Sequence, residues 1–251
     1  GIAPPPQPRK TFYNILVFHL GVRDRVYPNL GTIYDLAYVN GDATMKMNAS
    51  YQWLNAFVSS KLAKKKLILK RSNVKHWVTE TYDEMPSDQN PMGTRKVLVF
   101  DDALPRAFLV GDSRTVQKDK LIDVYYDPEF DPLKQVLLTE SVSVKKTENF
   151  SGQVNELQYP PNGVNIKTSQ NGEGFLVLLD TFFPGWQVTV DGTRQPIYRA
   201  NSFYRAVKLE PGNHSIEFSY VPVGLKMGFY ISSFASILIV LLFFKRTRLR
   251  Q

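Results

Sequence analysis

The feature that most constrains this chain is a run of 18 residues, 227–244, without a charged side chain. A helix of that length spans about 27 Å at ~1.5 Å per residue, close to the ~30 Å hydrocarbon thickness of a bilayer. Lys226 precedes the run and can place its ammonium group in the headgroup region, so the apolar segment extends over residues 223–244. The sequence therefore predicts a transmembrane helix over residues 223–244.

Four cations follow this segment in the last residues of the chain, 245–251. They are Lys245, Arg246, Arg248 and Arg250. Short basic segments beside a membrane helix stay on the cytoplasmic side. We therefore expect the protein to lie in the cell membrane, with a cytoplasmic C-terminus and with the bulk of the chain extracytoplasmic.

The basic character of the chain is local. The formal net charge is +8, but the tail supplies four cations and residues 61–75 supply seven more without an acid among them. Without these eleven cations the remaining residues carry a net charge of −3. Such a surface does not attract nucleic acid, and membrane lipid is the expected partner of the basic segments.

Residue types that carry chemistry are sparse and scattered. The chain has no cysteine, which excludes disulfides and thiolate metal ligands. His19, His76 and His214 are isolated and lack the spacing of metal ligands. No nucleotide-binding or nucleophile-elbow motif is present. The sequence therefore predicts no metal, no cofactor and no catalytic residue in this chain.

The pattern of apolar residues changes near residue 126, from mixed helix and strand spacing to strand spacing alone. The sequence therefore predicts an α+β protein. Residues 1–9 are Pro-rich and extended. Residues 10–125 mix short strands with one apolar stripe at helical spacing, which predicts a small α+β subdomain with a helix over residues 43–66.

Residues 126–222 carry short alternating runs at intervals of about 8–12 residues, which predicts an antiparallel β-sandwich. One expected strand covers residues 141–146. The Asp191-Gly192 pair predicts a tight hairpin between two strands.

One cation in the predicted sandwich breaks the pattern. Arg205 lies between Phe203 and Val207 on the apolar face of a strand. A buried guanidinium requires an ionic partner, and the candidates are Asp180, Asp191 and Glu217. We interpret this ion pair as structural.

Two groups of residues are candidates for ligand contact. Trp186 can stack on a sugar ring, although its alternation with two valines also fits a core position. Tyr198, Arg199 and Asn201 follow in a loop-like stretch. The second group is a basic cluster that fits lipid or polyprenyl phosphate, or alternatively a solvated helix end. Its members are Lys64, Lys65, Lys66, Lys70 and Arg71.

Several stretches carry a family resemblance. They include residues 73–78 (NVKHWV), 103–110 (ALPRAFLV) and 127–132 (DPEFDP), followed by the order Pro184-Gly185-Trp186, Asp191-Gly192, Arg205-Ala206-Val207 and Pro211-Gly212. Over roughly residues 25–245 the chain resembles the YfhO family of bacterial multi-spanning membrane proteins. Members of that family resemble GT-C glycosyltransferases, which move sugars from polyprenyl-phosphate carriers to envelope acceptors.

The resemblance implies that the chain is the C-terminal extracytoplasmic part of a longer, polytopic glycosyltransferase. Its implied partners are upstream transmembrane helices of the same protein and a polyprenyl-phosphate sugar or an envelope glycan. The chain begins at Gly1 without a signal-peptide pattern, and we expect a preceding segment. In GT-C enzymes the catalytic acid lies in an early extracytoplasmic loop, outside these residues. The alternative is a membrane-anchored carbohydrate-binding or structural β-sandwich module without enzymatic activity.

Overall fold

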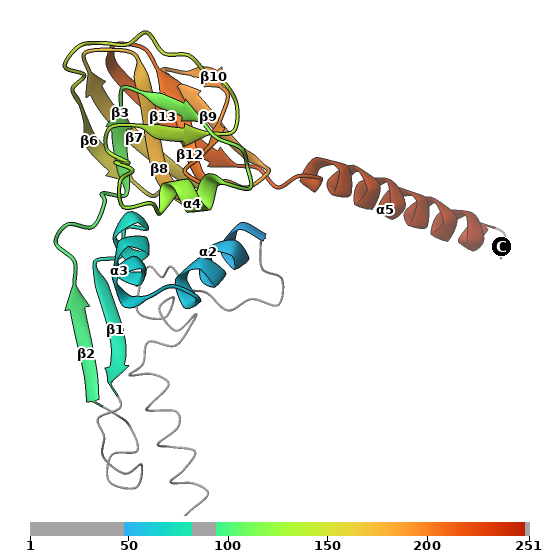
Figure 1. Cartoon of the computed structure of the whole chain (residues 1–251). Helices are drawn as coiled ribbons and strands as arrows, with labels where there is room; N and C mark the ends of the chain where they lie inside the picture. The colour runs from blue at the N-terminus through green and yellow to red at the C-terminus, as the bar shows by residue number, and fades with distance from the viewer. Residues whose placement is uncertain (1–47, 82–93, 249–251) are drawn as a thin grey trace, which may run out of the picture. The chain divides into compact units, whose positions relative to one another are not determined.

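The computed structural model describes residues 48–81 and 94–248, and the expected strands within residues 12–20 and 31–40 lie outside this range. The fold class is α+β, with mainly antiparallel sheets and a few helices (Figure 1). The chain divides into two compact units, Gly1–Pro105 and Arg106–Gln251. Each unit is described by itself.

In its described residues, the first unit contains two short helices and a pair of antiparallel strands. Its elements are α2 (Asn48–Val58), α3 (Leu62–Arg71), β1 (His76–Thr81) and β2 (Thr94–Val99). The prediction of one helix over residues 43–66 is wrong, because residues 59–61 interrupt it. The hydroxyl groups of Ser59 and Ser60 donate to the carbonyl oxygens of Asn55 and Ala56, and such back-bonding competes with a straight helix.

A small core holds this unit together. The Trp53 indole stacks on Phe57 with ring centroids 5.5 Å apart, and its Nε1 donates to the Ser72 hydroxyl at 3.0 Å. Ile68 and Leu69 of α3 are buried beside it. Three residues of the apolar stripe that predicted the helix are exposed, so the stripe does not form this core; they are Tyr51, Val58 and Leu62.

The second unit is a β-sandwich of two sheets (Figure 1). One sheet has five strands in the order β10-β9-β13-β7-β6, and the other has six in the order β3-β8-β12-β11-β5-β4. The five strands are β6 (Gly152–Gln158), β7 (Gly163–Gln170), β9 (Trp186–Val190), β10 (Thr193–Gln195) and β13 (Gly212–Tyr220). The six strands are β3 (Ala107–Val110), β4 (Ser113–Thr115), β5 (Val136–Leu138), β8 (Gly174–Thr181), β11 (Tyr198–Ala200) and β12 (Tyr204–Leu209).

Alternating residues of the two sheets form the main core. β7 and β13 bury every second side chain, as expected for strands with one face toward solvent. The buried cluster consists of Ala107, Leu109, Val164, Ile166, Leu176, Leu178, Val188, Val190, Val207, Leu209, Ile216 and Phe218.

The six-stranded sheet is covered on its second face as well. β8 buries its first six residues without alternation, which requires apolar partners on both sides. Helix α4 (Leu121–Tyr125) supplies part of this cover, with Tyr125 edge-on to Tyr204 at 6.1 Å. Phe175 meets Tyr198 in the same way.

Strand pairing corrects the predicted boundary between the two domains. β3 pairs with β8, and β4 pairs in parallel with β5. Residues 106–125, assigned from the sequence to the first subdomain, therefore belong to the sandwich, because β8 needs a partner on that edge. The strand predicted over residues 141–146 is absent, and these residues form an irregular connection.

The last element is helix α5, Leu225–Arg248. Gly224 precedes it with a φ of 86°, a left-handed conformation that glycine adopts without strain. Among the described residues, no helix combines the length and apolarity needed to span a membrane, and the predicted transmembrane helix is not supported by that test.

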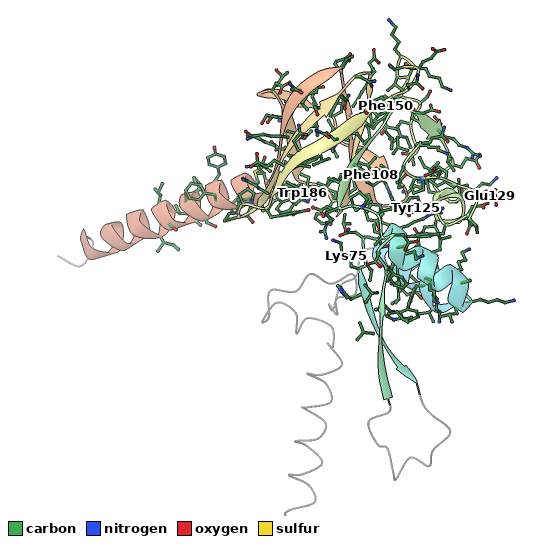
Figure 2. The ribbon with its side chains drawn as sticks, turned by 90° about the vertical axis from the view of Figure 1, so that its left-hand side faces the viewer. Lys75, Phe108, Tyr125, Glu129, Phe150 and Trp186 are labelled. Atoms are coloured by element: carbon green, nitrogen blue, oxygen red, sulfur yellow. The ribbon has the colours of Figure 1, made fainter. Side chains whose placement is uncertain are left out.

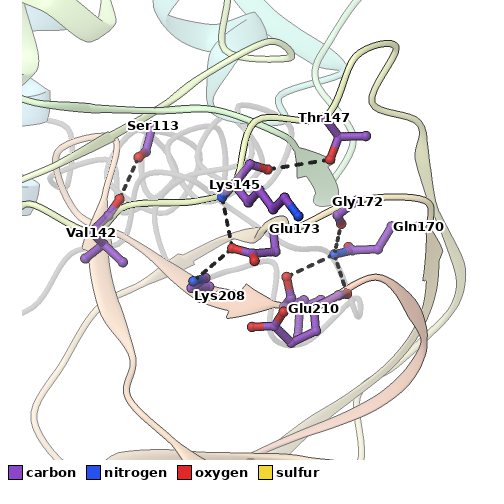
Figure 3. Close-up of polar contacts among 10 residues, drawn as sticks. Ser113, Val142, Lys145, Thr147, Gln170, Gly172, Glu173, Lys208 and Glu210 are labelled. Carbon is purple, nitrogen blue, oxygen red and sulfur yellow. Dashed lines mark hydrogen bonds and ion pairs between the residues drawn. The ribbon is translucent and has the colours of Figure 1, made fainter.

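Polar side chains close the end of the sandwich that contains the last residues of β7 and the first of β13 (Figure 3). The Gln170 Nε2 donates to the carbonyl oxygens of Gly172 at 2.9 Å, Leu209 at 3.2 Å and Glu210 at 2.9 Å. The Glu173 carboxylate accepts a hydrogen bond from the Lys145 amide at 3.0 Å and lies 3.1 Å from the Lys208 ammonium. The pKa of Glu173 is lowered, mainly by the Lys145 amide and also by Lys208. These contacts tie the turns of both sheets together.

Replacing Gln170 by Leu should lower the free energy of unfolding by about 1–3 kcal/mol, because three backbone carbonyls lose a buried donor. Urea unfolding of the whole chain in mild detergent, followed by tryptophan fluorescence, measures the change. The matched control is Gln153→Leu, an exposed position on β6, where we expect a change within about 0.5 kcal/mol. Equal effects at the two positions would contradict this assignment.

Candidate functional site

An arginine lies inside the core between the two sheets. Arg205 is on β12 on the same face as Val207 and Leu209, and its side chain is 2% exposed. The strand pairing with β8 shifts register between Tyr204 and Arg205, which marks a β-bulge. A bulge re-aims the side chains around it, and here it accompanies the placement of a cation among apolar residues.

Two aromatic rings of the opposite sheet hold the Arg205 guanidinium. Its Cζ lies 3.9 Å from the ring centroid of Trp186 and 5.1 Å from that of Phe218. A desolvated cation–π contact of this kind is worth about 2 kcal/mol. Among the residues that the structure describes, the Arg205 Nε and Nη1 have no hydrogen-bond partner.

One carboxylate serves two guanidinium groups. The Asp180 Oδ2 accepts from Arg205 Nη2 at 2.9 Å, and its Oδ1 accepts from Arg106 Nε at 2.7 Å and lies 2.5 Å from Arg106 Nη2. Asp180 is near the end of β8 and 11% exposed, whereas the Arg106 side chain is 38% exposed. The three residues form a line from the core to the surface.

The cluster is positively charged at neutral pH. Burial lowers the pKa of Arg205 to about 10, although the Asp180 charge opposes that shift, so the guanidinium stays protonated. Burial and the nearby Asp180 charge raise the pKa of Tyr159, which therefore stays neutral. The two positive charges of Arg106 and Arg205 and the single negative charge of Asp180 sum to one net positive charge.

Aromatic side chains surround this charge. Trp186 and Tyr220 have ring centroids 5.4 Å apart, and Phe183 lies 6.4 Å from Tyr220. The Arg106 guanidinium lies 5.7 Å from the ring centroid of Tyr159. Tyr159 and Phe183 are exposed, so the aromatic group reaches the surface. Figure 2 labels Trp186 at the end of the sandwich from which the chain runs on into α5.

A glycine turn connects this cluster to the start of the last helix. Gly185 has a φ of 105°, and its carbonyl accepts a hydrogen bond from the Val221 amide at 2.9 Å. A Cβ at this position would lie 2.7 Å from the Val221 carbonyl oxygen. Only glycine fits both the dihedral angle and the close approach.

The charged and aromatic residues described above form one group, which we call the Arg–Asp–Arg cluster. Its members are Arg106, Asp180, Arg205, Trp186, Tyr159 and Tyr220.

The structure answers which acid meets Arg205. Asp180 forms the ion pair with Arg205. Asp191 instead lies in the β9–β10 hairpin and contacts His214 Nδ1 at 2.7 Å. That His214 contact, together with a hydrogen bond from the Ser215 amide, lowers the pKa of Asp191. Glu217 lies on the exposed face of β13, away from Arg205.

The four residues proposed for ligand contact do not form one surface. Trp186 belongs to the five-stranded sheet and has one ring face covered by Arg205. Tyr198 packs against Phe175 on the far side of the other sheet. Asn201 is fully buried, and its Oδ1 accepts from the Leu137 amide at 2.9 Å.

Arg199, the remaining member, donates from its Nε to the Ser202 carbonyl at 2.5 Å. It therefore stabilises the turn at residues 201–202, where both residues have positive φ. The signal that selected these residues, a polar stretch between strands, reflects a tight turn with buried polar contacts.

The predicted basic cluster is divided by its contacts. Lys64 is exposed on α3, whereas Lys65 is half-buried, with its ammonium 5.5 Å from the ring centroid of Phe57. Lys66 is half-buried. The Lys70 ammonium lies 2.6 Å from the Asp102 carboxylate, whose pKa this hydrogen bond lowers. Arg71 is buried, so it does not belong to an exposed cation patch.

The side chains of the four cations of the tail lie outside the part of the chain that the structure describes. Lys245, Arg246 and Arg248 fall in α5, but their side chains lie outside the described residues, as does Arg250. Their topological role stays a prediction.

Three members of the Arg–Asp–Arg cluster were missed from the sequence, namely Arg106, Tyr159 and Tyr220. Arg106 directly precedes β3, and Tyr159 follows β6, so neither lies in a patterned element. Only the pairing of β3 with β8 brings Arg106 to Asp180. No local pattern in the sequence contains that information.

The geometry favours binding of an anion over catalysis. The cluster offers fixed positive charge and aromatic surface, and it contains no nucleophile next to a general base. Among the described residues, no group of three or more His, Asp or Glu side chains is placed to hold a metal ion.

Part of the chain matches a known protein family. The family model described as bacterial membrane protein YfhO matches residues 126–232. Over these residues the chain is similar to the YfhO family. No curated protein and no solved structure matches it significantly. The YfhO match includes Asp180, Trp186 and Arg205, whereas Arg106 and strands β3 and β4 precede it.

Removing the buried guanidinium should be costly. Arg205→Ala should lower the free energy of unfolding by about 3 kcal/mol or more, because it breaks a buried ion pair and leaves a cavity beside Trp186. Arg106→Ala should cost only about 1 kcal/mol, because its side chain is partly solvated. Urea unfolding of the whole chain in mild detergent gives both values.

The variant Arg205→Lys serves as the control for charge. It keeps the cation but loses the planar stack on Trp186, so its stability should fall between wild type and Arg205→Ala. If Arg205→Ala unfolds like wild type, the guanidinium does not hold the sheets together.

Proposed function

We propose that this chain is the extracytoplasmic, membrane-anchored part of a polytopic membrane protein that transfers sugars from a polyprenyl-phosphate carrier to a cell-envelope glycan. The match to the bacterial membrane protein YfhO family supports the membrane setting. The resemblance of that family to GT-C glycosyltransferases supports the reaction class. In this proposal the residues of the chain support the transferase, and the chemistry belongs to another part of the polypeptide.

The observation that carries the membrane part of the proposal is the surface of α5. Its large apolar side chains are exposed along the described part of the helix, including the runs 229–231 and 237–239, so they are spread around the helix axis. A helix of this kind requires apolar surroundings, which lipid or other membrane helices provide. The exposed side chains are Leu225, Met227, Phe229, Tyr230, Ile231, Phe234, Ile237, Leu238 and Ile239.

The sequence of α5 supports a span from one side of the bilayer to the other. The uncharged run continues from residue 239 to residue 244, beyond the side chains that the structure describes. The basic residues that follow favour a cytoplasmic C-terminus, and the sandwich then lies outside the cytoplasm.

A glycan-binding module is the alternative function. Exposed Tyr159 and Phe183 offer apolar ring surface to a sugar. Trp186 offers less, because the Arg205 guanidinium lies 3.9 Å above its ring. The described residues thus favour a structural role at this end of the sandwich.

Cysteine labelling tests the orientation, because the chain itself contains no cysteine. Thr193→Cys lies in the exposed strand β10, and Thr247→Cys lies near the end of α5. In a native polypeptide freed of other cysteines, a membrane-impermeant maleimide should label Thr193→Cys in intact cells and Thr247→Cys only after permeabilisation. The reverse pattern, or equal labelling of both, would overturn the proposed topology.

A transfer assay tests the reaction class. Membranes that contain the native polypeptide should consume a radiolabelled polyprenyl-phosphate hexose several-fold faster than membranes from a deletion strain. Residues 1–251 produced alone should restore none of that consumption, because the catalytic acid is placed elsewhere. Consumption by residues 1–251 alone would locate the chemistry in this chain, and no difference across a panel of hexoses would exclude the transferase.

A further inference from the structure

The charges of the Arg–Asp–Arg cluster do not balance. Asp180 accepts from both Arg106 and Arg205, so two cations share one anion. Among the described residues, no second carboxylate lies within ion-pair distance of either guanidinium. The Arg205 side chain is 98% buried, and its Nε and Nη1 lack partners. Buried charge without compensation is costly, and a bound anion would remove that cost.

The surface of the cluster has the chemistry of a membrane interface. Trp186, Tyr159 and Tyr220 combine an apolar ring with a polar group, and such residues concentrate at the level of lipid headgroups. Exposed Phe183 adds apolar surface beside them. A soluble anion such as inorganic phosphate would gain nothing from these rings.

The chain brings the cluster close to α5. Tyr220 ends β13 opposite Trp186, and α5 begins at Leu225, so four residues connect them. A fully extended connection of this length covers about 17 Å. The connection is shorter than that limit, because the Val221 amide bonds to Gly185 and the Leu225 amide bonds to the Pro222 carbonyl. If α5 is in the bilayer, the cluster lies within reach of the headgroup region.

We propose that the Arg–Asp–Arg cluster binds the phosphate ester of a membrane lipid, with Arg106 contacting the phosphate. This inference rests on the proposed membrane anchoring by α5. Arg106 uses its Nε and Nη2 for Asp180 and is partly exposed, so its guanidinium is accessible from the surface. Guanidinium groups bind phosphate through paired hydrogen bonds that an ammonium cannot reproduce.

Arg205 is a positioning residue in this site. It holds the second oxygen of Asp180 at 2.9 Å and thereby orients the carboxylate that holds Arg106. Its charge also strengthens the attraction for an anion inside a surrounding of low polarity. Two lipid sources share the required phosphate chemistry: a bulk anionic phospholipid and a polyprenyl phosphate.

Native mass spectrometry of the full chain in neutral detergent tests the site. Wild type should retain phosphatidylglycerol or polyprenyl phosphate in preference to a neutral diacylglycerol. Arg106→Gln should lower that retention about tenfold without lowering the melting temperature by more than a few degrees. Arg106→Lys should restore only part of it. The paired variant Lys64→Gln/Lys65→Gln removes two cations of the first unit and should change retention less than twofold.

The outcomes distinguish the two lipid sources, and they also distinguish failure of the lipid site from failure of the membrane anchoring. Stronger retention of polyprenyl phosphate identifies the carrier lipid as the ligand, and stronger retention of phosphatidylglycerol identifies the bulk lipid. Unchanged retention in Arg106→Gln would overturn the inference, as would equal competition by inorganic phosphate. If that happens while Thr193→Cys is still labelled from outside, the membrane anchoring stands and only the lipid site fails.

Discussion

The guanidinium of Arg205 is the contact on which one end of the sandwich depends. It lies between two sheets whose other facing residues are apolar, and it bonds to Asp180 while it stacks on Trp186. Because the ring and the carboxylate come from different sheets, the guanidinium joins them. A buried cation is expensive, and this one is tolerated because a carboxylate and two aromatic faces replace part of its hydration.

The two ends of the sandwich have different chemistry as a result. At one end Gln170 and Glu173 connect backbone turns through hydrogen bonds and an ion pair. At the other end the charge of Arg106 and Arg205 exceeds that of Asp180, and aromatic rings surround it. The second end leads into α5, whose apolar surface is exposed. The end with unbalanced charge is thus the end next to the helix that the proposal places in lipid.

In the proposed function this arrangement has a supporting role. The cluster can hold an anion and fix the turn at Gly185, but proton transfer would need a general base that the cluster lacks. In the transferase that we propose, this domain would keep a defined position at the membrane surface. That role requires stability and a lipid contact, and the Arg–Asp–Arg cluster supplies chemistry for both.

Local patterns in the sequence determined much of this protein. Alternation and turn residues predicted the β-sandwich and most of its strands, and the position of Arg205 on an apolar face predicted a buried ion pair. The sequence also contained the motifs that resemble the YfhO family, which the match over residues 126–232 confirmed. These features depend on neighbours within a few residues, which a sequence displays directly.

Only the tertiary structure decided which distant residues meet. It selected Asp180 over Asp191 and Glu217, brought Arg106 to the same carboxylate through the pairing of β3 with β8, and moved residues 106–125 into the sandwich. It also dispersed Trp186, Tyr198 and Asn201, which lie close in sequence. Strand order across two sheets controls these contacts, and it follows from the burial of whole faces, which no short stretch of sequence encodes.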